Sequence, residues 1–595
     1  MKHKKYTEIA PEDVLLDQAN LPAFDKTQLQ GRIVQSVGGG VLQFISFGVM
    51  CVIGVFMYSA YKTQVVQGAS FAEKAENNRF ESIPIFAPRG AIYDRNNIPL
   101  AWNTGDESGS IANRFYTQEG GFGNLLGYIK FPRKDKKGFY ITKDTIPVGG
   151  VEEYYNDILA GRPGSLYIET NATGDVVSET KADFPLKGKD LHLTLDSDIQ
   201  KNLYASIKKA SQESGYVGGV GMVVDVRDGS ILSAVTYPDF DANVMTSATD
   251  TATIQGYLSN KSSVFLHRYT SGLYAPGSIV KPVFAYAALK EHIVTPEEKI
   301  LSTGKLVVPN PYQKDAFTVF RDWKAHGYTN VREAIAVSSD VYFYTVGGGV
   351  PGKAGLGISK LRDYAKAFGL GETFEGTFFS SKQSVIPDPE WKARVFDGDE
   401  WRLGNTYHSS IGQYGFSITP VQVLAMTTLL ANEGKSLPVF KLTKEEPTRQ
   451  IPVNSNMVDG GGAIYNEIHE GMRLTVTAGT AQILNIGDLK IAGKTGTAQT
   501  GVANSHINSW FVGFWPYTNP KYAVAYLLEK APSSATKGAA FYLRDMFESC
   551  KSYGCDLSVA KENRRTDGST DSTETVGIDN LTSTEDVPAE LYENR

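Results

Sequence analysis

The chain has 595 residues, of which 41% are hydrophobic and 21% are charged. This length exceeds one ordinary domain and predicts two or three domains with flanking segments, and the composition is that of a globular protein with a sizeable core. The formal net charge of −6 argues against a nucleic-acid-binding protein, which is usually basic. Because the eight histidines are scattered and none shows metal-ligand spacing, neither a metal site nor another cofactor is expected.

An uncharged stretch lies between Arg32 and Lys62, and its most apolar part runs from Val41 to Tyr58. About 20 apolar residues cross a bilayer as a helix, so residues 33–61 are predicted to form a transmembrane helix after a cytoplasmic segment at 1–32. A cleaved signal peptide is disfavoured because the preceding segment is too long, and a buried core helix because the run has no polar face. A slight excess of Lys and Arg before the run favours an N-terminus inside the cell.

Residues 62–190 are rich in Gly, Tyr, Asn and Pro and contain short β-like runs such as LYIET at 166–170. This texture predicts an extended, β-rich and loop-rich domain rather than a compact enzyme core.

Alternating strand and helix patterns begin near Asp190 and predict a mixed α/β domain over residues 191–549. They open with a helix N-capped near Asp196 or Ser197 and a hairpin around an Asp-Gly turn in GMVVDVRDGSILSAVTY. Residues 550–595 are rich in Ser, Thr and acidic residues, and a disordered tail is predicted there. Cys550 and Cys555 are able to pair in an oxidising compartment and would remain thiols in a reducing one.

Ser278 and Lys281 form the first candidate motif, in SGLYAPGSIVKPVFAYAALK. A turn at Pro276 and Gly277 precedes an apolar run typical of a helix, so the serine hydroxyl is predicted at a helix N-terminus, where N–H groups stabilise negative charge. Lys281 follows one turn later on the same face and can act as the base for a nucleophilic serine when its amine is neutral. The same Ser-x-x-Lys spacing occurs six more times in the chain, so this motif alone carries little weight.

Ser338 and Asp340 belong to the second candidate motif, in NVREAIAVSSDVYFYTVG. One apolar helical pattern ends at these polar residues and another begins, which leaves two interpretations open. In the first, the polar residues cap a helix N-terminus. In the second, the Ser338 hydroxyl carries a proton between Lys281 and the leaving amine, and Asp340 is an orienting hydrogen-bond partner.

The third candidate motif consists of Lys494, Thr495, Gly496 and Thr497, in the β-like segment DLKIAGKTGTAQT. Such a strand can pair with an extended peptide and hold its carboxylate through Thr497 and Lys494, with Thr495 and Gly496 completing the binding strand. The backbone N–H of Thr497, with that of the nucleophilic serine, would form an oxyanion hole. A phosphate-binding loop also ends in Gly-Lys-Thr, but its first glycine would have to replace Asp488, so nucleotide binding is disfavoured.

The three motifs occur in the order Ser-x-x-Lys, Ser-x-Asp and Lys-Thr-Gly, about 60 and about 155 residues apart. This constellation resembles that of the penicillin-recognising serine transferases and hydrolases. The flanking segments resemble the class B penicillin-binding proteins, and the resemblance covers roughly residues 80–530. The segments that carry it are APRGAIYDRNNIPLAWN, GGVEEYYNDILAGRPG, YPDFDAN, HRYTSGLYAPGS, FRDW and IGQYGFSITPVQ.

Three positions depart from the family pattern. Asp340 stands where many relatives have Asn, and this favours the elongation-type branch over the division-type branch. Tyr414 interrupts the usual Gly-Gln-Gly run, which puts the geometry of that loop in question. Asn97 replaces a turn glycine, and Asn is the residue that best tolerates such a conformation.

The resemblance implies a serine transpeptidase or β-lactamase-like α/β (α+β) domain at 191–549, an extended β-rich pedestal at 62–190 and a single transmembrane helix. It implies a single-pass protein of the bacterial cytoplasmic (inner) membrane with its catalytic domain outside the cytoplasm. It also implies a multi-span glycosyltransferase partner of the elongation or division machinery, and no such domain in this chain.

By the same resemblance, the activity is D,D-transpeptidation of peptidoglycan stem peptides through an acyl-enzyme on Ser278, with covalent binding of β-lactams. Lys281 would act as base, and Ser338 and Lys494 would relay the proton to the departing D-alanine. Two alternatives use the same fold: a β-lactam-binding hydrolase or sensor, and a non-catalytic scaffold for wall synthesis. A pedestal of over a hundred residues is unexplained by a β-lactamase, and three intact motifs argue against a scaffold.

Overall fold

The computed structural model describes residues 39–70, 80–104, 113–133, 144–170, 176–310, 315–551 and 555–556. The chain divides into one unit of Met1–Glu81 with Ile168–Glu179 and a second unit of Ser82–Tyr167 with Thr180–Arg595. The predicted cytoplasmic segment at 1–32 lies outside the described residues, as does nearly all of the predicted tail at 550–595.

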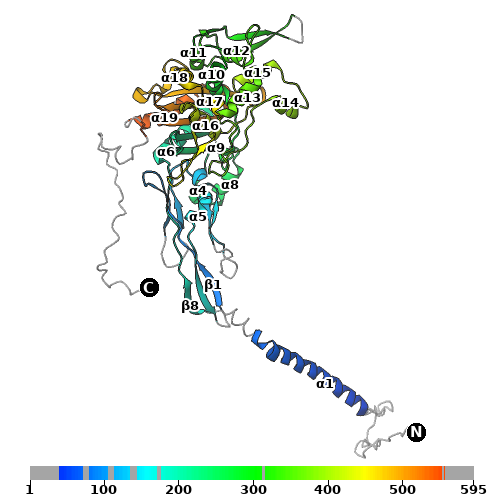
Figure 1. The fold of residues 1–595 in the computed structure, drawn as a ribbon. Helices are drawn as coiled ribbons and strands as arrows, with labels where there is room; N and C mark the ends of the chain where they lie inside the picture. Colours follow the sequence, from blue (N-terminus) through cyan, green and yellow to red (C-terminus); the bar gives the residue numbers. More distant parts are fainter. Residues whose placement is uncertain are drawn as a thin grey trace, which may run out of the picture. The chain divides into compact units, whose positions relative to one another are not determined.

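The described part of the first unit contains one long apolar helix, α1 (Gly39–Tyr61), drawn in blue in Figure 1. It continues into a short π-helical turn at Lys62–Val66, and none of its side chains is buried against protein. Among the residues that the structure describes, this is the one helix that is long and apolar enough to cross a membrane. The helix predicted over 33–61 is therefore found from residue 39 onward, and residues 33–38 are not described.

The region before residue 190 contains short strands and short helices, as its composition predicts. The strands form three small sheets, in the orders β1-β7-β8, β4-β3-β2-β9 and β5-β6. LYIET lies in β7, which confirms the prediction of a strand there. The elements are β1 (Phe80–Ile85), β2 (Ile92–Tyr93), β3 (Pro99–Thr104), β4 (Asn113–Tyr116), α3 (Gly123–Leu126), β5 (Tyr128–Lys130), β6 (Ile146–Val148), α4 (Gly150–Tyr154), α5 (Asn156–Leu159), β7 (Gly164–Thr170), β8 (Val176–Asp183) and β9 (Leu191–His192).

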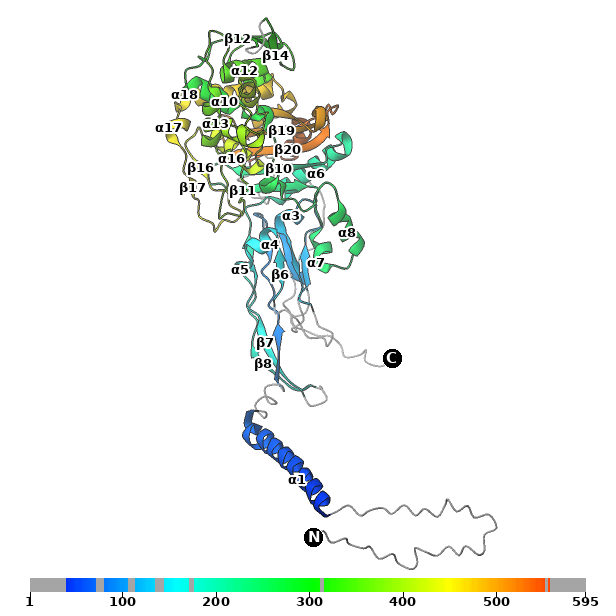
Figure 2. The ribbon, with the colours of Figure 1, turned by 90° about the vertical axis from the view of Figure 1, so that its right-hand side faces the viewer.

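A five-stranded antiparallel sheet in the order β11-β10-β20-β19-β18 forms the centre of the second unit (Figure 2). Among the strands that the structure describes, β18 pairs only with β19, so no strand pairs with its other edge. The strands are β10 (Gly218–Asp225), β11 (Ile231–Tyr237), β18 (Ala492–Thr500), β19 (His506–Trp515) and β20 (Tyr522–Pro532).

Helices cover both faces of this sheet. Side chains alternate between the two faces along each strand, so each strand contributes apolar residues to both faces. Met222 and Trp510 pack in the cluster formed with helices α10, α16 and α18, whereas Val223 and Phe511 pack in the cluster formed with α6 and α19. The mixed α/β domain predicted from the sequence is thereby confirmed as a three-layer arrangement. The helices are α6 (Ser197–Ser214), α10 (Lys281–Lys290), α16 (Pro420–Ala431), α18 (Gly461–Thr477) and α19 (Ala539–Ser549).

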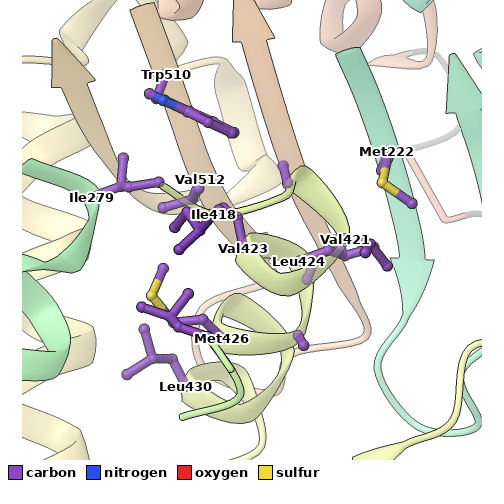
Figure 3. Packing of buried hydrophobic residues seen from close by; sticks show 14 of the residues in the cluster. Met222, Ile279, Ile418, Val421, Val423, Leu424, Met426, Leu430, Trp510 and Val512 are labelled. Atoms are coloured by element: carbon purple, nitrogen blue, oxygen red, sulfur yellow. The ribbon is translucent and has the colours of Figure 1, made fainter. Parts of the chain in front are cut away.

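Helix α16 is entirely buried and links the sheet to the segment that carries Ser278. Figure 3 shows Val423 of this helix near Val512 of β19, in the same hydrophobic cluster as Ile279, Leu424 and Trp510. Since Ile279 directly follows Ser278, the packing of the core fixes the position of the candidate nucleophile.

Local signals in the sequence predicted several of these elements correctly. Asp196 caps α6, where its carboxylate accepts hydrogen bonds from the backbone N–H groups of Asp198 and Ile199. β10 and β11 form the predicted antiparallel hairpin, whose turn contains Gly229 with φ of +81°. Asn97 adopts φ of +60°, the left-handed conformation that the family's glycine would favour.

The remaining elements surround the sheet and its helices. They are α7 (Ala242–Ser247), α8 (Thr251–Ser259), α9 (Arg268–Ser271), η5 (Gly277–Val280), β12 (Ile300–Ser302), β13 (Lys305–Pro309), β14 (Phe317–Arg321), β15 (Gly327–Thr329), α11 (Val331–Val337), α12 (Asp340–Gly348), α13 (Gly357–Ala367), α14 (Pro389–Val395), α15 (Leu403–Ser410), β16 (Leu437–Pro438), β17 (Gln450–Ile451), α17 (Ser455–Val458), η6 (Gln482–Leu484), η7 (Gly487–Leu489) and η8 (Val502–Asn504). After α19, a disulfide joins Cys550 to Cys555, both fully buried against Phe547 and its neighbours.

Candidate active site

Ser278 lies in η5, a single 3-10 turn that leads directly into α10. The preceding Gly277 has φ of +58°, and its N–H donates to the carbonyl of Gly412 at 3.0 Å. A Cβ atom at residue 277 would lie 2.8 Å from the carbonyl oxygen of Thr497. Glycine is therefore required here for its conformation and for the close approach of β18, and this approach sets Ser278 beside the third motif.

Lys281 is fully buried, and its ammonium joins the first motif to the second. Its Nζ donates to the carbonyl of Ser338 at 2.8 Å, to Ser338 Oγ at 3.3 Å and to Asp340 Oδ1 at 2.6 Å. An ammonium has three protons to donate, so these three acceptors satisfy it. Among the described residues, no hydrogen bond involves the Ser278 hydroxyl, which lies one turn before Lys281.

The two interpretations of the second motif apply to two adjacent serines. Ser338 ends α11 in the left-handed conformation, with φ of +60°, and turns its side chain toward Lys281. Ser339 is the N-cap of α12, where its Oγ accepts from the N–H of Tyr342 at 3.3 Å. The capping role thus belongs to Ser339, and the Ser338 hydroxyl is left facing Lys281.

The third motif lies on β18, at the open edge of the central sheet. Lys494 is fully buried and its Nζ donates to the carbonyl of Thr495 at 2.8 Å, while Thr497 is exposed. Thr495 Oγ1 lies 2.5 Å from Thr480 Oγ1. A Cβ at Gly496 would lie 2.8 Å from Ile279 Cγ2, so the small residue lets the strand reach the Ser278 turn.

Electrostatics distinguish the two lysines. Burial lowers the pKa of Lys494 well below its ordinary value, the nearby charge of Lys281 lowers it further, and Asp340 opposes the shift. The two lysines and Asp340 therefore form one electrostatic cluster, in which Lys281 is paired with Asp340 and a neutral Lys494 amine is favoured. A neutral amine can accept a proton.

Sequence reasoning missed Asp322, although it noted the FRDW segment. Asp322 Oδ2 accepts from Ser339 Oγ at 3.0 Å, from the N–H of Val341 at 3.0 Å and from Ser302 Oγ at 3.2 Å. This carboxylate fixes the start of α12 and with it the turn that carries Ser338. An acidic residue inside a family-like segment was the available signal. For Thr480 the sequence contained no comparable signal.

Tyr414 occupies the position that the family pattern assigns to glycine, and it keeps a left-handed conformation with φ of +54°. Its ring makes edge contacts with Trp391 and Trp401, with ring centroids 6.1 and 5.6 Å apart. The loop still reaches the nucleophile, because Gly412 contacts Gly277. The departure therefore leaves the support of Ser278 in place, and aromatic contacts hold a backbone conformation that tyrosine disfavours.

Comparisons with known proteins agree with this geometry. The sequence model of the penicillin binding protein transpeptidase domain matches residues 219–545, and that of the penicillin-binding protein dimerisation domain matches residues 105–193. The chain is 27% identical to peptidoglycan D,D-transpeptidase MrdA of Haemophilus influenzae over 629 residues, which cover 87% of this chain and 93% of that protein.

Two solved structures are similar. One is PBP2 of Pseudomonas aeruginosa in complex with WCK 5153, with a TM-score of 0.62 and 26% identity, covering 79% of this chain and 96% of that one. The other is PBP2 of Helicobacter pylori in complex with MreC, with a TM-score of 0.64, covering 80% of this chain and 99% of that one. The second is 23% identical, so it shows the fold alone.

Proposed function

Because the chain belongs to the penicillin-binding protein transpeptidase family, we propose that it is a peptidoglycan D,D-transpeptidase that acts through an acyl-enzyme on Ser278 and binds β-lactams at the same residue. The observation that carries this assignment is the Lys281 ammonium, which links the helix behind Ser278 to the turn that carries Ser338 and Asp340.

Acylation begins when Ser278 Oγ attacks the carbonyl carbon of the penultimate D-Ala of a donor stem peptide. An ester bond forms, the peptide C–N bond breaks, and the terminal D-Ala leaves as an amine. For this step Lys281 must be a neutral amine, in which form it takes the hydroxyl proton; the proton then passes through Ser338 and Lys494 to the departing amine. The lowered pKa of Lys494 supports its part in this relay, since a lysine with a lowered pKa releases a proton more readily than an ordinary lysine.

The open edge of β18 is suited to pair with the extended donor peptide. Thr495, Gly496 and Thr497 would contact its backbone and carboxylate, and the N–H groups of Ser278 and Thr497 would stabilise the oxyanion. The close approach of Gly277 to the Thr497 carbonyl supports this pairing of donors. An amine from a neighbouring stem then attacks the ester, forms the cross-link and returns the proton to Ser278.

The test is to incubate the full-length protein with a labelled penicillin and locate the adduct by mass spectrometry. A stable ester on Ser278, absent from Ser278→Ala, is expected. Rapid turnover of the label would instead indicate a hydrolase, and a folded protein that forms no adduct would indicate a scaffold.

Two features support the proposed cellular location. Helix α1 would anchor the chain as a single span in the bacterial cytoplasmic membrane, with residues 1–32 inside and the catalytic domain outside. The Cys550–Cys555 disulfide supports this orientation, because disulfides persist in oxidising compartments and are rare in the cytosol. Protease added to intact spheroplasts should digest the catalytic domain, and its protection would contradict this orientation.

The organisation proposed for the chain is a pedestal over 62–190 and a transpeptidase domain over 191–549. The family resemblance suggests a separate multi-span glycosyltransferase as the partner that polymerises glycan. Asp340, where many relatives have Asn, favours the elongation machinery over division. Co-purification from detergent-solubilised membranes tests this partner, and a chain isolated alone under conditions that preserve such complexes would argue against it.

A further inference from the structure

A basic and aromatic surface lies on the hairpin β13–β14 and on the residues that follow it. We call it the hairpin platform. It consists of Lys305, Val307, Phe317, Val319, Arg321, Trp323 and Lys324. None of these residues belongs to the proposed catalytic machinery.

Two cations of the hairpin platform face each other across the strands. Lys305 is directly opposite Arg321 in the β13–β14 register, and both are exposed. Like charges in this position destabilise a strand pair. Within the part of the chain that the structure describes, neither cation has an acidic side chain as a partner. An anionic ligand would relieve the repulsion.

The same face of the hairpin is apolar beyond the cations. Val307 is opposite Val319, and both are 44% exposed, while Phe317 at the end of the hairpin is 64% exposed. The opposite face carries Val308 and Phe320, which are buried. The hairpin therefore packs one face on the protein and presents an apolar stripe with a cationic end to solvent, a pattern that marks binding surfaces.

The cationic end of the platform also carries an exposed aromatic side chain. Trp323 is 57% exposed, and Lys324 Nζ lies 4.5 Å from the centroid of its ring. This arrangement adds a third positive charge three residues after Arg321 in the chain, together with a flat apolar ring surface.

Asp322 connects the hairpin platform to the proposed active site. It stands between Arg321 and Trp323, and its carboxylate accepts from Ser339 Oγ and the N–H of Val341, both at 3.0 Å. The platform is thus joined through one buried side chain to the turn that carries Ser338.

We propose that the hairpin platform binds the anionic peptidoglycan strand that delivers a stem peptide to Ser278, an inference that rests on the proposed function. Free carboxylates of the stem peptides would pair with Lys305, Arg321 and Lys324, and the sugar rings would lie on exposed aromatic side chains. A polymer that carries both sugars and carboxylates matches a surface that has exposed aromatic rings as well as cations. An acidic protein segment would need only the cations and the aliphatic stripe, so the exposed Trp323 favours the glycan.

The test is co-sedimentation of the full-length detergent-solubilised protein with purified insoluble peptidoglycan sacculi. The variants are Lys305→Glu/Arg321→Glu and the milder Lys305→Gln/Arg321→Gln, and the matched control is Lys208→Glu/Lys261→Glu, which reverses two exposed cations elsewhere. The charge-reversed variant should bind sacculi about tenfold more weakly than the wild type and the control, since each exposed cation–carboxylate contact contributes modestly. Thermal melting of each variant verifies that the fold is intact.

Sacculi whose carboxylates have been converted to neutral amides provide the second comparison. Wild type and charge-reversed variant should bind them equally. Equal binding of both proteins to untreated sacculi would overturn the proposal and leave the platform to an acidic protein segment. If the glutamate variant unfolds, the glutamine variant is compared with the wild type in the same sedimentation experiment, and equal binding of the two proteins would overturn the proposal. Labelling of the wild type by penicillin tests the proposed function separately, because it does not depend on sacculus binding.

Discussion

The Nζ atom of Lys281 lies 2.6 Å from Oδ1 of Asp340, and this ion pair joins the helix behind Ser278 to the helix that follows Ser338. Lys281 is fully buried, whereas the side chain of Asp340 is 19% exposed. A buried ammonium needs a counter-charge or hydrogen-bond acceptors, so Asp340 determines how well Lys281 is held at the site.

Substitutions of Asp340 should therefore distinguish the contribution of its negative charge to acylation from the contribution of its hydrogen bond to Lys281. Asp340→Asn keeps an acceptor for Lys281 and should acylate within about tenfold of the wild-type rate, whereas Asp340→Ala should be about 100-fold slower. The measurement is the second-order rate constant with a labelled penicillin. Asp315→Asn, at an exposed position, is the control. An alanine variant as fast as the wild type would show that the ion pair does not organise the site.

Lys494 should lower the free energy of unfolding, although it is needed for acylation. Its pKa is lowered in the folded state and is about 10.4 in the unfolded chain. Between these two values the unfolded state binds more protons, so this lysine opposes folding at neutral pH, and the penalty shrinks as pH rises toward the unfolded value.

Lys494→Met should therefore raise the free energy of unfolding at neutral pH by about 1–3 kcal/mol and abolish acylation. The wild-type stability should rise more steeply between neutral pH and about pH 10 than that of the variant. Denaturant unfolding over a pH series measures both, with Lys208→Met as an exposed control. A less stable variant would indicate that the lysine is charged and well compensated in the fold.

Gly496 should tolerate no side chain. A Cβ there would lie 2.8 Å from Ile279 Cγ2 and 3.0 Å from the carbonyl oxygen of Pro276, so Gly496→Ala must displace the Ser278 turn or the strand. Acylation should fall about 100-fold, because small misplacements of a nucleophile are costly, and the unfolding free energy should fall by about 1–3 kcal/mol. Gly256→Ala on α8 is the control, because a Cβ at residue 256 would have no neighbouring atom within 4 Å. Neither its acylation rate nor its unfolding free energy should fall. If Gly496→Ala were acylated as fast as the wild type, the close approach of β18 to the Ser278 turn would be refuted.

The Cys550–Cys555 disulfide closes a loop with a sequence separation of 5 residues after α19. A loop of this size stabilises a fold by about 2 kcal/mol through the unfolded chain. Reductant should lower the stability of the wild type by that amount and leave Cys550→Ala/Cys555→Ala unchanged. Thiol titration of the denatured, unreduced protein should find one free cysteine, Cys51, of the three in the chain. Three reactive thiols would rule out the disulfide.

Local signals predicted much of the fold. The cap of α6 at Asp196, the hairpin between β10 and β11 and the apolar helix α1 each depend on residues adjacent in sequence. Side-chain periodicity, turn residues and capping groups act between residues that are close in sequence. Their effects can therefore be predicted without the tertiary structure. The three motifs were likewise recognisable by composition and order, although each one alone was ambiguous.

The tertiary structure decided how those motifs meet. Which serine of the second motif caps α12 and which faces Lys281 depended on the left-handed turn at Ser338 and on Asp322, whose carboxylate directly follows β14 and lies 17 residues before Ser339 in the chain. The open edge of β18 depended on strand order, which no local pattern specifies. The opposed cations Lys305 and Arg321 depended on strand register. Residue identities determined the available chemistry, whereas the distances between groups far apart in the chain arose from packing of the whole core, in which every element limits the others.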